Sequence, residues 1–240
     1  MAENDTCRLQ VFLSHAGVSS RRAAEKLILA GRIKVNGQIV TTLGTKVQAG
    51  DTVLFDSKPV QPESALHYLA LNKPPLFLCS QSDPENRPLA RGLLPRAIHE
   101  RLYSVGRLDY LSSGLIFFTN DGAFAARLSH PSNRIEKEYF VESVQPIPSE
   151  LAEQFSSGIT IEGIKYQAAR LRQLDERTIN ITLIEGKNRE IRRVFSHFHI
   201  HPKTLRRIRI GPVELGSLAE GRSRPLEAGE LSLLNTLPTG

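Results

Sequence analysis

The sequence predicts an α+β fold, in which a domain with a mixed, mainly antiparallel sheet follows a small N-terminal α/β domain. From Tyr68 onward, strand-like runs outnumber helical ones, and the helices are placed irregularly instead of alternating with strands as in a doubly wound sheet. The proline-containing stretch 57–64 separates these runs from a front module that has its own helices and hairpin. We therefore expect two domains, at 7–57 and 65–237.

The front module has the pattern of two helices followed by a tight hairpin. Apolar residues recur at helical spacing over 9–16. Ser19 or Ser20 can cap a second helix, because a serine hydroxyl accepts a hydrogen bond from a free backbone N–H of the first helical turn. Asn36 and Gly37, with β-branched residues on both sides, are a strong short-range signal for a hairpin turn.

The second domain has more strand-like than helical segments. We expect strands at 68–71, 102–108, 115–119, 139–144, 168–174 and 178–183, and helices at 123–128, 149–155 and 189–197. Neither GxGxxG nor GxxxxGK[ST] occurs, which argues against an enzyme that uses a dinucleotide or a nucleoside triphosphate. The alternating His197, His199 and His201 have no adjacent acidic or cysteine partner, so we expect no metal site.

Net charge and cysteine content limit the class of partner and the compartment. The chain has 31 basic and 25 acidic residues and a net charge of +6, which favours a polyanionic partner. Cys7 and Cys79 have no zinc-type spacing, and we expect free thiols in a reducing compartment. The start MAENDTC is acidic, unlike a signal peptide, and the apolar runs are short. We expect a cytoplasmic protein that does not enter a membrane.

Basic residues are concentrated between Glu185 and Arg209. Arginine outnumbers lysine there by six to two, and the planar guanidinium fits phosphate better than an ammonium group does. A solvated helix face would have the same composition, but the density of charge favours phosphate contacts. The basic residues are Lys187, Arg189, Arg192, Arg193, Lys203, Arg206, Arg207 and Arg209, and the acidic ones are Glu185 and Glu190.

Asp109 lies where one strand-like run ends and before the next begins. The run 102–108 stops at this residue, and 115–119 resumes as a β-branched and aromatic strand. A carboxylate on a short loop between two strands is held by the sheet and stays accessible, so it can serve as a reagent. The ordinary alternative is a turn aspartate that caps its own backbone, because Asp-x-x-Ser is common turn chemistry.

The front segment RLQVFLSHAGVSSRRAAEKLILAGRIKVNGQ resembles the RNA-binding domain first seen in ribosomal protein S4. The resemblance covers about fifty residues. It implies contacts to RNA backbone, in a stem-loop or pre-ribosomal particle, since folded RNA is recognised largely by its shape and phosphate positions. The residues that it assigns to RNA binding are Ser20, Arg21, Arg22, Lys26, Arg32 and Lys34.

Three later segments resemble the pseudouridine synthases of the RsuA/RluB type. GRLDYLSSGLIFFTNDG, HPSNRIEKEYFV and EGKNREIRRVF match family motifs, and LALNKPP and GRSRPLEAGEL are weaker matches. The resemblance implies that Asp109 is the catalytic residue, that Tyr139 packs against the target base, and that Arg192 pairs with the aspartate. It also places RNA or substrate contacts at Arg107, Lys187, Asn188, Arg189 and Arg193.

The resemblance implies isomerisation of a specific uridine to pseudouridine in ribosomal RNA, without a cofactor. The segment 40–53 is closer to the large-subunit enzymes of the RluB type, so we expect large-subunit rRNA as substrate and a monomeric enzyme. Three alternatives stay open: a small-subunit rRNA enzyme, a catalytically silent RNA-binding or ribosome-assembly protein, and a nucleoside or base hydrolase. A hydrolase would need a second carboxylate in the motif region, where Asp121 has the pattern of a turn residue.

Overall fold

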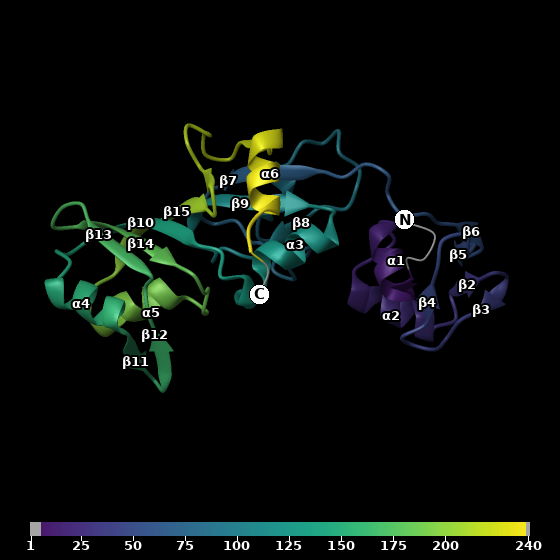
Figure 1. The fold of residues 1–240 in the computed structure, drawn as a ribbon, viewed down its shortest axis with the longest axis horizontal. Helices are drawn as coiled ribbons and strands as arrows, with labels where there is room; N and C mark the ends of the chain where they lie inside the picture. Colours follow the sequence, from purple (N-terminus) through teal and green to yellow (C-terminus); the bar gives the residue numbers. More distant parts are fainter. Residues whose placement is uncertain (1–5, 239–240) are drawn as a thin grey trace. The chain divides into compact units, whose positions relative to one another are not determined.

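The computed structural model describes residues 6–238, and the chain divides into two units (Figure 1). The first unit runs to Leu66 and also takes in His99–Arg101 and Asn120–Gly122. The second unit contains the remainder from His67 onward. Each unit has its own hydrophobic core. Within the described residues, no helix is long and apolar enough to cross a bilayer.

The first unit is built from two short helices and short antiparallel strands. The turn at Asn36 and Gly37 joins two paired strands as expected, since both residues adopt positive φ angles of 50° and 82°. Ser20 is the cap of the second helix, and its Oγ accepts from the Ala23 N–H at 3.2 Å. Its elements are β1 (Cys7–Arg8), α1 (Leu9–His15), α2 (Arg21–Leu29), β2 (Ile33–Val35), β3 (Gln38–Ile39), β4 (Lys46–Val47), β5 (Val53–Phe55) and β6 (Lys58–Pro59).

Among the described residues, the second unit contains a nine-stranded mixed sheet, four α-helices and two short 3₁₀ helices. Its strands are β7 (Tyr68–Lys73), β8 (Tyr103–Val105), β9 (Ser113–Thr119), β10 (Lys137–Ser143), β13 (Arg170–Gln173), β14 (Thr178–Leu183), β15 (Pro202–Ile210), β16 (Val213–Glu214) and β17 (Ser223–Pro225). The hairpin β11 (Ile159–Ile161) and β12 (Ile164–Tyr166) stands apart from the sheet. The helices are η2 (Pro131–Asn133), α3 (Gly122–Ser129), α4 (Ser149–Ser157), α5 (Glu190–His197) and α6 (Ala228–Asn235), and η1 (Ala90–Leu93) lies in the loop after β7.

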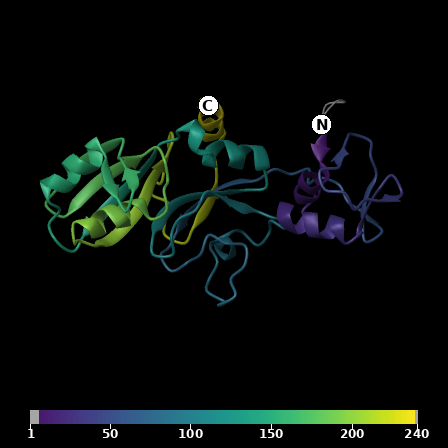
Figure 2. The same cartoon turned by 90° about the horizontal axis from the view of Figure 1, so that it is seen from below.

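The order β13-β14-β10-β15-β9-β7-β17 confirms the predicted α+β class. Every strand pair in this sheet is antiparallel except β15 with β9. This parallel pair joins the two halves of the sheet (Figure 1). The first half has the order β13-β14-β10-β15, and the second half has the order β9-β7-β17. Figure 2 shows α4 and α5 beside the first half, and α3 and α6 beside the second.

Three hydrophobic clusters form where helices and loops pack against the faces of this sheet. Helices α4 and α5 bury Leu151, Phe155 and Phe195 against β10, β14 and β15. Along β9, alternate residues serve opposite faces, because successive strand side chains point to opposite sides. Phe117 packs with α3 and α6, whereas Phe118 packs under the long segment between β7 and β9. Burial on both faces makes β9 an internal strand that holds the adjacent loop in place.

One strand was predicted too long, and another was not predicted. The run 102–108 was expected to be one strand, but β8 ends at Val105, and Gly106 has a φ of 71°, so the chain turns away before Asp109. The segment 202–210 was not expected to be a strand at all, because basic residues occupy Lys203, Arg206, Arg207 and Arg209. In the structure this segment is the central strand β15.

Candidate active site

Asp109 lies on the loop between β8 and β9, as predicted, and hydrogen bonds fix this loop on several sides. The Leu108 N–H donates to Cys79 Sγ at 3.4 Å. The Tyr110 carbonyl accepts from Leu76 N–H at 2.6 Å, and the Asp109 carbonyl accepts from Ser112 N–H at 3.0 Å. Backbone contacts on both sides of Asp109 therefore define the position of its side chain.

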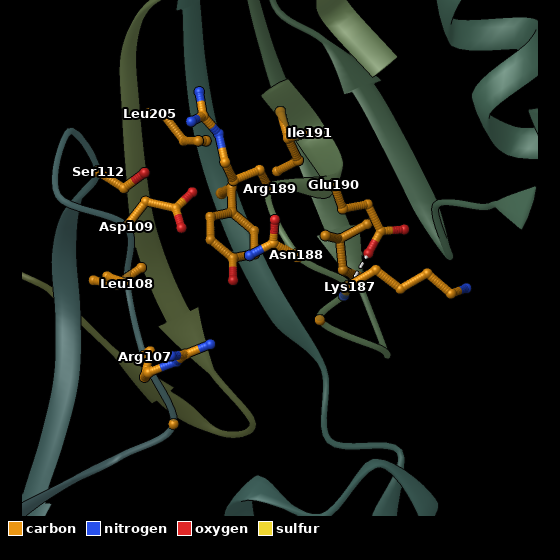
Figure 3. Close-up of a pocket in the computed structure, with 14 residues that line it drawn as sticks. Arg107, Leu108, Asp109, Ser112, Lys187, Asn188, Arg189, Glu190, Ile191 and Leu205 are labelled. Atoms are coloured by element: carbon orange, nitrogen blue, oxygen red, sulfur yellow. Dashed lines mark hydrogen bonds between the residues drawn. The ribbon is translucent and has the colours of Figure 1, made fainter. Parts of the chain in front are cut away.

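The Asp109 carboxylate faces a cavity of about 290 Å³. Figure 3 shows Asp109 and Ser112 on one wall of this pocket, and Asn188 and Glu190 on the facing wall. Asp109 is half-buried, and among residues 6–238 none donates a hydrogen bond to its side-chain oxygens. A carboxylate that is fixed by its backbone and has no hydrogen-bonded protein partner is available to an incoming ligand.

Tyr139 lines the same pocket from the middle of β10. The ring packs against both the cluster under α4 and α5 and the cluster under the segment between β7 and β9. Arg207 of β15 lies beside it, with Nη1 3.5 Å from Tyr139 Oη and the guanidinium carbon 6.0 Å from the ring centroid. The tyrosine therefore presents a half-buried aromatic surface in the pocket while its hydroxyl is held from behind.

Arg207 was not singled out by the sequence, because it is one of eight basic residues in its block. Only 4% of its surface is exposed, and its Nε donates to the Leu115 carbonyl of β9 at 2.7 Å. Its Nη2 is buried, and in the described part of the chain no acceptor lies within hydrogen-bonding distance of that atom. A buried guanidinium without a bonded carboxylate contributes positive potential behind the pocket.

In the described residues Arg192 makes no direct ion pair with Asp109, and their pairing stays a prediction. Arg192 Nη2 donates to the Leu111 carbonyl at 3.0 Å and to Ser112 Oγ at 3.4 Å, so the arginine binds the loop instead of the carboxylate. Helix α5 carries Arg192 in its first turn. Burial lowers the Arg192 pKa, whereas the Asp109 charge acts in the opposite direction, so the two charges still attract each other.

Lys73 is a further cation near the site, at the end of β7. It is fully buried, and its Nζ donates to the carbonyls of Pro74 and Phe77 at 2.8 and 3.0 Å. Burial lowers the Lys73 pKa to about 8, although Cys79 and Asp109 partly oppose that shift. The sequence signal for this residue is the segment LALNKPP, one of the two weaker matches to the family motifs.

The wall opposite Asp109 is the turn that leads into α5. Glu190 is buried, and its Oε2 accepts from the Lys187 N–H at 3.1 Å (dashed in Figure 3). Burial raises the Glu190 pKa, and the Lys187 hydrogen bond counteracts this. Arg189 adopts a left-handed conformation with a φ of 51°. Lys187, Asn188 and Arg189 of this turn line the pocket, and their contacts to substrate stay a prediction.

Arg107 also lines the pocket, but Arg193 does not. Arg193 forms an ion pair with Glu162 at 3.0 Å and borders a different hollow beside β11. The helical period separates it from Arg189 by about one turn, which places the two side chains near one another but not in one pocket. Arg193 therefore stays a predicted RNA contact outside the pocket.

The basic residues between Glu185 and Arg209 do not form one continuous surface. Lys203 pairs with Glu142 at 2.7 Å. Arg209 pairs with Glu136 and Glu138 at 3.1 and 2.9 Å. The alternation of β15 places Arg206 on the face opposite Arg207, because adjacent strand residues point to opposite sides. Folding therefore divides these charges among the pocket, the sheet interior and the far face.

The predicted RNA contacts of the first unit have different environments. Ser20 caps α2, and Arg32 forms a bidentate ion pair with Asp56 while lying 4.9 Å above the Phe55 ring. Lys34 is half-buried on β2. The remaining predicted contacts lie exposed on α2 and are Arg21, Arg22 and Lys26.

No metal cluster is found within residues 6–238: no three His, Cys, Asp or Glu side chains are grouped to hold an ion. His197 ends α5, and His199 has a φ of 57°, so the alternating histidines leave the helix in different directions. Cys7 and Cys79 are free thiols. The chemistry of the pocket therefore rests on its carboxylate, phenol, amide and cationic side chains.

Two family descriptions match the chain. That of the RNA pseudouridylate synthases matches residues 67–197, and that of the S4 domain matches residues 7–53. The first range contains Asp109, Tyr139 and Arg192, and the second contains all of the predicted RNA contacts of the front module. The two matches correspond to the two segments of sequence whose motifs were separated by 57–64.

Similar proteins cover almost the full chain. An uncharacterised RNA pseudouridine synthase of Borreliella burgdorferi is 40% identical and covers 95% of this chain and 93% of its own. Ribosomal large subunit pseudouridine synthase B of Bacillus subtilis is 37% identical over 96% of both chains. A crystal structure of a pseudouridylate synthase has a TM-score of 0.71 and 30% identity, and covers 95% of this chain and 99% of its own.

Proposed function

Because the chain belongs to the RNA pseudouridylate synthase family and carries an S4 domain, we propose that it isomerises one specific uridine of large-subunit ribosomal RNA to pseudouridine. Asp109 is the catalytic residue of this proposal, and no cofactor takes part. The enzyme acts as a cytoplasmic monomer with an RNA-binding domain at 7–57 and a catalytic domain at 65–237.

The observation that carries the proposal is the placement of Asp109. Its carboxylate faces the pocket that Tyr139 and Asn188 also line, and its loop is held by backbone hydrogen bonds on both sides. Because the loop is already ordered, the side chain can contact the substrate without a further loss of conformational entropy during the reaction. The same residue lies in the sequence segment matched by the family.

The reaction needs no electron or phosphoryl transfer. The bond from uracil N1 to ribose C1′ breaks, the base turns within the pocket, and its C5 bonds to C1′. The proton on C5 leaves, and N1 gains one, so atoms and charges balance. Uracil can leave as a delocalised anion and stays bound for the second step, which is why a single carboxylate is sufficient where ordinary glycosidases use two.

Asp109 acts on the ribose, by attack on the sugar or by removal of a sugar proton, and both routes require the ionised carboxylate. The positive charges of Arg192 and of the buried Lys73 each interact electrostatically with Asp109. Arg192 also holds the Asp109 loop through Leu111 and Ser112. Charge and position are therefore controlled together.

Tyr139 supplies an aromatic surface for the uracil ring, and its hydroxyl lies within reach of proton transfer at C5. Arg207 holds that hydroxyl from behind the pocket. Arg107 lies on the same loop as Asp109 and faces the pocket mouth, where it can contact the phosphate of the bound nucleotide. These roles leave Asp109 as the only carboxylate needed for the sugar.

The nucleotide enters the pocket by flipping out of its helix or loop, since a stacked uridine conceals C1′. The cavity of about 290 Å³ lies at the lower end of the range for small-ligand sites, which extends from about 300 to 1,000 Å³, and so suits one nucleoside better than a base pair. Unstacking costs a few kcal/mol. Contacts to phosphate from the S4 domain and from the pocket rim offset this cost and make binding dependent on salt.

The large-subunit target is supported by the relative from Bacillus subtilis, whose name specifies that subunit. A small-subunit target is the second candidate within the same chemistry. Unmodified transcripts of both rRNAs, treated with the enzyme, labelled with carbodiimide and read by reverse transcription, distinguish these candidates. A stop that appears only in the large-subunit transcript supports the proposal, and one only in the small-subunit transcript contradicts the assigned target.

Asp109→Asn tests the catalytic assignment on the same transcript. The substitution keeps the size of the side chain but removes its charge, so we expect no pseudouridine and nearly unchanged RNA binding. Equal amounts of pseudouridine from the wild type and from Asp109→Asn would contradict the catalytic role of Asp109. If the wild type forms no product on either rRNA while it binds both, the protein is a silent RNA-binding protein, and the proposed reaction is wrong.

A further inference from the structure

We propose that a basic groove beside the active-site pocket binds phosphate groups of the RNA strand that flanks the target uridine; this rests on the proposed function. We call it the flank groove. It has a volume of about 750 Å³, larger than the pocket itself. Its polar lining is formed by Ser132, Arg134, Ser156, Lys165, Gln167, Glu185 and Lys187.

The flank groove adjoins the pocket of Asp109 at Lys187. Lys187 lines both cavities, and Glu185 of the same turn lines the groove. A uridine that enters the pocket stays linked to its neighbours through phosphates on both sides. The strand must therefore leave the pocket along an adjoining surface, and the flank groove provides one at the end of β14.

The charge of the flank groove matches a phosphate backbone. Among its lining residues, three are basic and one is acidic, Glu185. Glu185 pairs with Lys187 at 2.7 Å, whereas Arg134 and Lys165 have no carboxylate partner within ion-pair distance in the described residues. Two exposed cations are thus available for a ligand, and neighbouring hydroxyl and amide groups supply neutral hydrogen bonds.

The side chain of Lys165 passes close to Gly158, the C-cap residue of α4. A Cβ at Gly158 would lie 2.4 Å from Lys165 Cε, so only a residue without a side chain lets the lysine stem lie there. The carbonyl end of a helix also attracts a cation, which gives Lys165 a stabilising role independent of RNA. Arg134 is the C-cap residue of the three-residue η2 and does not lie at the end of α4, so it separates the two explanations.

A second hollow of this unit, of about 470 Å³, has a different charge. It lies on the opposite face of the sheet and is lined by the acids Glu138, Glu214 and Glu220 and the bases Arg206 and Arg209. Arg209 is already paired with Glu138. An excess of carboxylates disfavours a phosphate backbone, so the flank groove is the better path for the strand.

The test measures how binding of unmodified large-subunit rRNA transcript depends on salt. The variants are Arg134→Gln and Lys165→Gln, and Arg172→Gln is the matched control, because Arg172 is an exposed arginine that shares its sheet face with Asn180, away from α4 and α5. Each lost phosphate contact flattens the slope of log K against log salt by about 0.7 to 0.9. We expect this change in both groove variants and an unchanged slope in the control.

Two further variants keep the result independent of folding. Lys165→Arg retains the charge and should restore the wild-type slope, while a thermal melt reports any loss of the helix-end contact. Glu185→Gln removes the groove's acid and frees Lys187, so we expect tighter binding and a steeper slope. Wild-type slopes in Arg134→Gln, Lys165→Gln and Glu185→Gln would overturn the flank groove.

Measuring pseudouridine formation by the same variants distinguishes a failure of the flank groove from a failure of the proposed function. The groove predicts a higher KM for the transcript in Arg134→Gln and Lys165→Gln. Product formation with unchanged slopes and unchanged KM would contradict the groove alone. A wild-type protein that forms no product would contradict the proposed reaction, while the salt slopes would still decide whether RNA lies in the groove.

Discussion

Arg192 donates a hydrogen bond of 3.0 Å to the Leu111 carbonyl, and this contact joins α5 to the loop that carries Asp109. The arginine therefore positions the aspartate through its backbone while its charge acts at longer range. Three structural elements meet at the pocket: the loop after β8, the middle of β10 and the turn before α5. The predictions below test how each contact contributes.

Replacing Arg192 by lysine should slow pseudouridine formation although the charge is kept. An ammonium group cannot reproduce the guanidinium contacts to Leu111 and Ser112. A shift of the reacting group by about 1 Å can cost roughly 100-fold in rate. We expect a fall of about 10- to 100-fold in the single-turnover rate constant, with RNA affinity almost unchanged. Arg192→Met should be no faster than Arg192→Lys, and full activity in the lysine variant would contradict the positioning role.

Arg207→Met should reduce activity without a matching loss of stability. The substitution removes the contact to the Tyr139 hydroxyl, but it also removes a buried charge whose Nη2 has no acceptor among the described residues. Replacing a buried charge by an apolar side chain of similar volume is often neutral or stabilising. We expect the rate of product formation to fall by about tenfold or more. Urea denaturation should give a free energy of unfolding within about 1 kcal/mol of the wild type, and a loss of several would show that the Leu115 contact dominates.

Gly114→Ala should destabilise the sheet strongly. The glycine has a φ of 100°, and a Cβ there would lie 2.2 Å from the Arg207 carbonyl oxygen, so β9 and β15 could not keep their parallel contact. Gly163→Ala is the control, because its φ is 77° but its Cβ would meet nothing within 4 Å. We expect a cost of about 1 to 2 kcal/mol in the control, from conformation alone, and a further 1 to 3 kcal/mol at Gly114. Equal melting temperatures for both variants would contradict the predicted clash.

Lys73 should make stability rise with pH in the alkaline range. Burial lowers its pKa to about 8 from the ordinary lysine value of 10.5. Between these values the unfolded chain binds more protons than the native protein, so the free energy of unfolding increases with pH, by up to roughly 3 kcal/mol over this window. Lys73→Met lacks this titration, while Lys137, whose pKa burial also lowers to about 8, contributes equally to both proteins. Denaturation curves from pH 7.5 to 10.5 (about three pH units) give the comparison, and a constant difference between the two proteins would exclude the buried cation.

Ser20→Ala should lower the stability of the first unit by about 1 kcal/mol, since the hydroxyl accepts from Ala23 N–H and caps α2. Ser20→Thr keeps an oxygen acceptor and should retain most of this stability. Ser19→Ala is the matched control, because that hydroxyl donates to the Ser20 carbonyl and does not cap the helix. Binding of the rRNA transcript at a temperature where all variants are folded tests the second role: weaker binding by Ser20→Ala alone would show that the serine also contacts RNA.

The local features of the sequence were predicted correctly because neighbouring residues determine them. Ser20 caps its helix, and the Asn36-Gly37 turn forms from residues that accept positive φ. Asp109 lies on a loop because the apolar run before it ends and a fully buried strand follows. These features depend on short-range sterics and hydrogen bonds, which the sequence carries directly.

The strand β15 could not be predicted in this way. Its basic residues interrupt the alternation of apolar and polar residues that is typical of a strand with one buried face. In the folded protein, Lys203 and Arg209 form ion pairs with carboxylates of β10, the neighbouring strand. Those carboxylates lie about sixty to seventy residues away along the chain. Only the pairing of the two strands reveals that the charges are neutralised and the segment can enter the sheet.

By itself, the sequence determined the fold class, the loop position of Asp109 and the family motifs around Tyr139 and Arg192. The tertiary structure decided which partner Arg192 binds, that Lys73 and Arg207 lie buried around the pocket, and how the basic block is divided. The reason is physical. A hydrogen bond or an ion pair between distant segments depends on strand register and burial, which arise only when the whole sheet assembles, whereas caps and turns form from adjacent residues.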